Sequence, residues 1–154
     1  MRHFGQALEL VAGVEPGVES HLQVAIGRIR RIDGDSHHAA NAYRRALELF
    51  GELGSSAETI SRTRLELADA LTAAGDHEGA AAELETVQRE CEADGRVGLV
   101  ARAVGMLGSI DELAGRARDA QVRYEEAAGL AAEAGDAPGY RRWLSASKTL
   151  RASL

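Results

Sequence analysis

Residues 67–91 read LADALTAAGDHEGAAAELETVQREC, two amphipathic segments separated by a Gly-Asp pair. Apolar residues at spacings of three and four, as at Leu67 and Leu71, form a stripe on one face of a helix. Gly75 suits the left-handed position that ends a helix, and Asp76 can cap the helix that follows. The stretch therefore predicts two antiparallel helices joined by a tight turn.

The same pattern occurs three times along the chain, which indicates an internal repeat. Glycines at 34, 75 and 115 set repeat lengths of 41 and 40 residues. The small residues in the pattern predict places where two helix backbones cross closely, because a bulky side chain there would push the helices apart. The matching sets are Ile26-Gly27, Gly34, Ala39, Tyr43 and Ala46; Leu67-Ala68, Gly75, Ala80, Leu84 and Val87; and Leu107-Gly108, Gly115, Ala120, Tyr124 and Ala127.

Composition agrees with a single helical array. The chain has 154 residues, of which 45% are hydrophobic but only 4% aromatic, and this balance favours closely packed helices over a β-sandwich. Its net charge of -6 gives no electrostatic support for binding nucleic acid or an anionic membrane. No apolar run approaches the length of a membrane helix and no signal peptide is evident, so we expect a cytoplasmic protein. The one cysteine, Cys91, falls on an apolar stripe and is expected to be a buried thiol.

The repeats divide the chain into one array over residues 1–154. The first segment, 1–13, matches the second helix of a repeat, and the last, 139–152, has the polar outer face of a capping helix. Tyr43 and Tyr124 are expected in the core, and Trp143 is expected there too, with a partly exposed interface anchor as the alternative. The eight predicted helices are 1–13 (a partial repeat), 18–33 and 36–53 (repeat 18–53), 57–74 and 77–93 (repeat 57–93), 97–114 and 117–134 (repeat 97–134), and 139–152.

The order of large residue, aliphatic–small pair, glycine turn, alanine, aromatic and alanine resembles tetratricopeptide repeats (TPR). Residues 43–54 and 101–108 resemble the subtype of about 40 residues, which is common in bacterial signalling and transcriptional regulators. The resemblance implies an all-α, right-handed superhelical solenoid of antiparallel helix hairpins. It also implies a scaffold that binds protein or peptide partners. Val24, Arg28, Leu65 and Asp69 stand where some members carry a Lys and Asn clamp for a peptide carboxylate, so that binding mode is not implied.

The concave side of such a solenoid is formed by the first helix of each hairpin, and it is the usual binding surface. His21, Arg62, Arg102 and either Arg141 or Arg142 occupy equivalent positions and form a basic ladder. Arginine in the first turn of a helix is unfavourable by roughly 0.3–1 kcal/mol, so the ladder indicates either an acidic peptide partner or a salt-bridged, solvated face. The candidate partner-binding residues are His21, Arg28, Arg31, Arg62, Leu65, Asp69, Arg102, Ser109, Glu112 and Arg142.

The sequence offers no catalytic or metal site. His37 and His38 are adjacent, so on a helix they point about 100° apart, and no further ligands complete a site. No phosphate-binding loop and no paired nucleophile and base are evident. We therefore expect a non-catalytic protein without a cofactor or a metal.

The beginning of the chain suggests an alternative role. Phe4, Leu8 and Val11 are expected to face a helix that this chain does not contain, which would leave an apolar end exposed. Either the chain is part of a longer array or this end self-associates into a homo-oligomer. A self-associating assembly element and a sensor of peptides or small molecules are thus the alternatives to a partner-binding scaffold.

Overall fold

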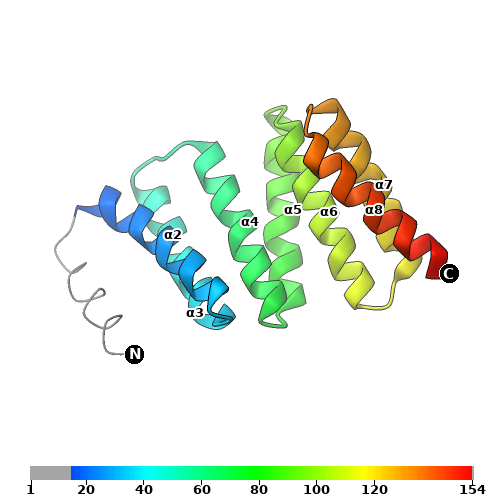
Figure 1. Ribbon diagram of the computed structural model, residues 1–154. Helices are drawn as coiled ribbons and strands as arrows, with labels where there is room; N and C mark the ends of the chain where they lie inside the picture. The colour runs from blue at the N-terminus through cyan, green and yellow to red at the C-terminus, as the bar shows by residue number, and fades with distance from the viewer. Residues whose placement is uncertain (1–14, 154) are drawn as a thin grey trace.

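The computed structural model describes residues 15–153, and this part of the chain is entirely helical (Figure 1). It contains seven helices of 17 residues each and no strand. Each helix starts and ends within two residues of its predicted bounds. The helices are α2 (Pro16–Ile32), α3 (Ser36–Glu52), α4 (Ala57–Ala73), α5 (His77–Ala93), α6 (Val97–Leu113), α7 (Ala117–Glu133) and α8 (Ala137–Ser153).

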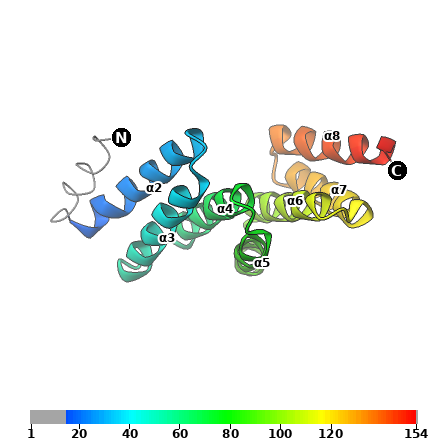
Figure 2. The same cartoon turned by 90° about the horizontal axis from the view of Figure 1, so that it is seen from below.

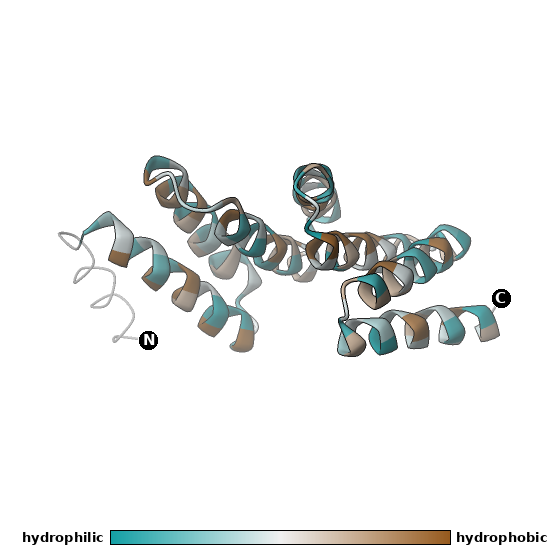
Figure 3. Ribbon diagram, turned by 90° about the horizontal axis from the view of Figure 1, so that it is seen from above, coloured by the Kyte–Doolittle hydropathy of each residue, from teal (hydrophilic) through white to brown (hydrophobic). Residues whose placement is uncertain are grey.

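Each helix packs on the next helix along the chain, and α4 also contacts α6 while α6 contacts α8. Seen from below, α2 and α8 flank α4 and α6 on one side, whereas α5 lies on the other side (Figure 2). Hydrophobic and hydrophilic residues alternate along the helices, as expected when each helix buries one face (Figure 3). The arrangement confirms the predicted all-α helical solenoid.

The predicted glycine turns end the helices. Gly75 has a φ of +84°, a conformation that glycine adopts without strain. Its N–H donates to the Thr72 carbonyl at 3.1 Å, and the Asp76 N–H donates to the Leu71 carbonyl at 2.9 Å. The Asp76 carboxylate then accepts from the Gly79 N–H at 2.9 Å, which caps α5. One Gly-Asp pair thus closes α4 and starts α5, as the sequence predicts.

Small residues at the helix crossings hold the large core side chains. A Cβ atom added to Gly27 would lie 2.6 Å from the Tyr43 ring, and one added to Gly105 would lie 2.3 Å from the Trp143 ring. Tyr43, Trp143, Tyr124 and Cys91 are all buried, as predicted. The Tyr124 and Trp143 rings stack with centroids 5.9 Å apart, which joins α7 to α8.

Some expectations fall on residues 1–14, outside the described residues. They are the helix at 1–13 and the self-association surface of Phe4, Leu8 and Val11, and both stay predictions. The division of the chain into repeats and a capping helix also stays a prediction. Among residues 15–153, no helix combines the length and the apolar character that crossing a bilayer requires.

Candidate functional site

A groove of about 460 Å³ lies among α2, α4, α6 and α8, on the side where these helices gather. Side chains from all four helices line it, and four of its residues are arginines. Six of the ten predicted partner-binding residues are in this lining: Arg28, Arg31, Leu65, Asp69, Arg102 and Arg142. The other four lining residues, which were not among the predicted partner-binding residues, are Ile32, Glu66, Met106 and Trp143.

Two of the four arginines form ion pairs with α4. The Arg28 guanidinium contacts both carboxylate oxygens of Glu66, with Nη2 2.5 Å from Oε1 and Nε 2.9 Å from Oε2. Arg31 Nη1 lies 3.2 Å from Asp69 Oδ2. The α2 and α4 side of the groove is therefore internally neutralised.

Glu66 is held in its charged form. Burial alone would raise its pKa, but the hydrogen bonds from Arg28 and the positive charges of Arg28 and Arg102 leave the pKa below its ordinary value. Tyr43 lies beneath this pair, and its pKa is raised by burial and by the nearby Glu66 carboxylate.

The other two arginines are unpaired. Within residues 15–153, neither Arg102 on α6 nor Arg142 on α8 forms an ion pair or a hydrogen bond. Arg142 lies over the Trp143 indole, with Cζ 4.5 Å from the ring centroid. Burial and the positive charges of Arg62 and Arg142 lower the pKa of Arg102. The groove thus has an excess of two positive charges, four arginines against two carboxylates, in a chain of net charge -6.

A second hollow of about 340 Å³ adjoins the groove at Arg102. It is also lined by Arg62, whose Nη2 lies 2.7 Å from Glu58 Oε1 on the same helix. Arg62 therefore has a carboxylate partner one turn away. The predicted basic ladder is interrupted here, because one of its members is neutralised by its own helix.

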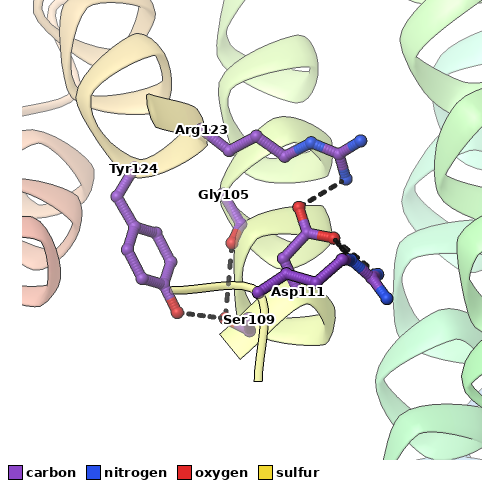
Figure 4. A network of polar contacts seen from close by, with 6 residues as sticks. Gly105, Ser109, Asp111, Arg123 and Tyr124 are labelled. Atoms are coloured by element: carbon purple, nitrogen blue, oxygen red, sulfur yellow. Dashed lines mark hydrogen bonds and ion pairs between the residues drawn. The ribbon is translucent and has the colours of Figure 1, made fainter. Parts of the chain in front are cut away.

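The remaining predicted residues lie outside both hollows. His21 Nδ1 is 2.8 Å from the Gly17 carbonyl oxygen, and its ring meets Phe50 edge-on with centroids 5.4 Å apart. Ser109 and Glu112 face the Tyr124 hydroxyl, which is 3.2 Å from Ser109 Oγ and 2.7 Å from Glu112 Oε2. Figure 4 shows Ser109 and Tyr124 in the contact between α6 and α7. These three residues contact nearby side chains or backbone and do not line the groove.

Burial raises the pKa of Tyr124 to about 12, the Ser109 hydrogen bond opposes this rise, and the Glu112 carboxylate adds to it. The phenol is therefore neutral at physiological pH and acts as a hydrogen-bond donor. Its position between two α6 side chains makes it a packing contact.

Metal-binding residues are not clustered in the described chain. Among residues 15–153, no group of three His, Cys, Asp or Glu side chains could hold a metal ion. His38 Nδ1 instead lies 2.7 Å from Asp35 Oδ1, and this hydrogen bond lowers the pKa of Asp35. Asp35 also accepts from the His38 N–H at the start of α3, so it is a helix cap.

Comparisons with known proteins show the fold and no family. No protein-family model matches the chain, and no curated protein matches it. The crystal structure of the apo form of RapI is similar with a TM-score of 0.77 at 14% identity, covering 88% of this chain and 49% of RapI. The structure of BtubC (BKLC) from P. vanneervenii is similar with a TM-score of 0.64 at 17% identity, covering 90% of this chain and 65% of BtubC. The chain thus spans about half of RapI and somewhat under two thirds of BtubC, and the likeness is that of a TPR-like helical repeat fold.

Proposed function

We propose that the chain is a non-catalytic scaffold module that binds a segment of a partner polypeptide in the groove among α2, α4, α6 and α8. The observation that carries this proposal is the groove itself, which places two unpaired arginines beside apolar side chains on a helical framework. The resemblance to the TPR subtype of bacterial signalling and transcriptional regulators supports a place in such a protein. The fold shared with RapI supports a helical scaffold.

The groove lining suits a polypeptide segment. Met106 and Ile32 provide accessible apolar surface in the lining, while Arg102 and Arg142 provide charged donors. An extended peptide carries both kinds of side chain at short spacing and can satisfy both. The four helices are fixed by packing on their neighbours, so binding requires little ordering of the scaffold.

The test is a selection of short linear peptides from a random phage-displayed library. Selected peptides are synthesised with a fluorescein label and their affinities are measured by fluorescence polarisation. Met106→Trp should fill the groove and weaken binding by about tenfold or more. Val122→Trp is the matched control, because Val122 is 65% exposed on α7 and does not line the groove.

Circular dichroism and thermal melting establish that both variants fold. Peptides that lose affinity for Met106→Trp and keep it for Val122→Trp support the proposed function. If no peptide is selected, or if every selected peptide binds both variants equally, the groove does not bind peptides and the proposal is wrong.

A further inference from the structure

We propose that the α6 and α8 side of the groove is a subsite for an acidic side chain of the bound segment, with Arg102 and Arg142 as its donors and Met106 beside it as the contact for a neighbouring apolar side chain. The inference rests on the proposed function and specifies the chemistry of the partner. It names a peptide Asp or Glu as the occupant.

Arg102 and Arg142 are chosen because the other arginines near the groove already have carboxylate partners. Arg28 and Arg31 already contact carboxylates on α4, and Arg62 contacts Glu58. Arg102 and Arg142 line the same groove, and within the described residues neither has a carboxylate partner. A carboxylate from outside can therefore pair with them without breaking an existing ion pair. It would also relieve the repulsion between their charges.

An unpaired arginine is not by itself unusual on a protein surface. Arg118 on α7 is exposed and forms no ion pair within residues 15–153, but it does not line the groove. Arg102 and Arg142 differ because they lie in a concave site next to Met106 and Trp143. Charge–charge and apolar contacts are thus available within one hollow.

The charge of the whole chain limits the occupant. The net charge of -6 repels a long polyanion such as a nucleic acid. A peptide segment with one or two carboxylates faces only the local excess of two positive charges in the groove. The subsite therefore fits a locally acidic polypeptide better than an extended phosphate backbone.

The arrangement also alters the predicted ladder. The sequence placed His21, Arg62, Arg102 and either Arg141 or Arg142 as equivalent members, whereas His21 lies outside the groove and Arg62 has its own carboxylate. Two adjacent positions remain available. The acidic contact is therefore confined to the α6 and α8 side.

The experiment extends the library selection with two readouts. Peptides selected on the wild-type chain are sequenced, and their Asp and Glu content is compared with that of the unselected library. Their affinities are then measured for Arg102→Gln, Arg142→Gln and, as the matched control with the same change of charge, Arg118→Gln. Melting and circular dichroism check that each variant folds.

We expect enrichment of Asp and Glu beside an apolar residue, and about a tenfold loss of affinity for Arg102→Gln and for Arg142→Gln. Arg118→Gln should bind as the wild type does, and raising the salt concentration should weaken binding to the wild type more than to either groove variant. Should Arg102→Gln not fold, Arg142→Gln and the peptide composition still test the subsite, because Arg142 is exposed on α8.

The outcomes separate this inference from the proposed function. The subsite is wrong, but the peptide-binding groove stands, if the peptides lose affinity for Met106→Trp without being enriched in Asp and Glu. The same holds if they bind Arg102→Gln and Arg142→Gln as tightly as the wild type. Peptides that bind Met106→Trp as well as wild type would overturn both.

Discussion

The Arg28 guanidinium and the Glu66 carboxylate form a bidentate ion pair between α2 and α4, two helices separated in the chain by α3. α2 packs chiefly against α3, so this pair and the Arg31–Asp69 pair connect it across the groove to α4. The two ion pairs are the polar contacts that join α2 to α4, in addition to the packing of α2 on α3. Their loss should loosen one wall of the groove without removing the helices.

Glu66→Gln tests this contact through its pH dependence. The pKa of Glu66 is lowered in the folded chain, so its ionisation stabilises the fold fully above the ordinary value of 4.5, and this stabilisation is lost as the pH falls through the folded pKa. The variant should lose about 0.5–1.5 kcal/mol of unfolding free energy at neutral pH. Urea denaturation at several pH values should show the difference from wild type closing below pH 4.5. Glu85→Gln, at an exposed site on α5, is the control, and a difference that persists in acid would contradict the ion-pair account.

Gly105→Ala tests the close approach of α6 and α8. The added Cβ would lie 2.3 Å from the buried Trp143 ring, so we expect a loss of about 1–3 kcal/mol of unfolding free energy. Gly129→Ala is the control, because nothing lies within 4 Å of the Cβ position there. That change should stabilise α7 by up to about 1 kcal/mol through helix propensity. Equal effects in thermal melts would show that the Trp143 contact is not what requires glycine.

Gly75→Ala tests the left-handed turn between α4 and α5. At a φ of +84°, alanine places its Cβ against the backbone, and the expected cost is roughly 1–2 kcal/mol. Gly75→Asn should cost less, because asparagine tolerates this conformation better. Denaturant midpoints of the two variants check the order, and an alanine variant as stable as the asparagine variant would contradict it.

Asp111→Asn tests the polar clasp between α6 and α7 (Figure 4). Asp111 is 4% exposed; its Oδ1 lies 2.6 Å from Arg116 Nη2 and its Oδ2 lies 3.2 Å from Arg123 Nη1. Replacing the charge should cost about 1–3 kcal/mol, less than for a fully buried pair because both arginines are partly exposed. A double-mutant cycle with Arg123→Gln measures how much of this unfolding free energy comes from the Asp111–Arg123 pair. Zero coupling in that cycle would show that Arg123 does not stabilise the carboxylate.

The fold was predictable because its signals are local. Gly75 and Asp76 mark a turn by their own conformational and capping preferences, and the apolar spacing around Leu67 marks a helix. Gly27 was predicted at a helix crossing because it precedes a repeated turn at a fixed offset, and the Tyr43 ring occupies the space where its side chain would be. None of these inferences needs knowledge of a distant contact.

The groove was predictable only in part. Repeat spacing placed Arg102 and Arg142 on the inner side, and the structure puts them in the groove. Glu66 was missed because its contact with Arg28 joins residues 38 positions apart and depends on how far α4 is rotated toward α2. Ser109 and Glu112 share the helix of Arg102 but face Tyr124, and this choice depends on where α7 packs. Such helix rotations depend on packing between helices, and the repeat spacing in the sequence does not predict them.

Packing of each helix on its neighbour in the chain also determines how the fold comes apart. Within residues 15–153, no long loop has to close before contacts form, so folding can begin in any hairpin and spread in both directions. Trp143 is the one tryptophan of the chain and lies on α8. Its emission consequently reports the packing of α8 on α6 and α7, whereas circular dichroism reports the average of all the helices.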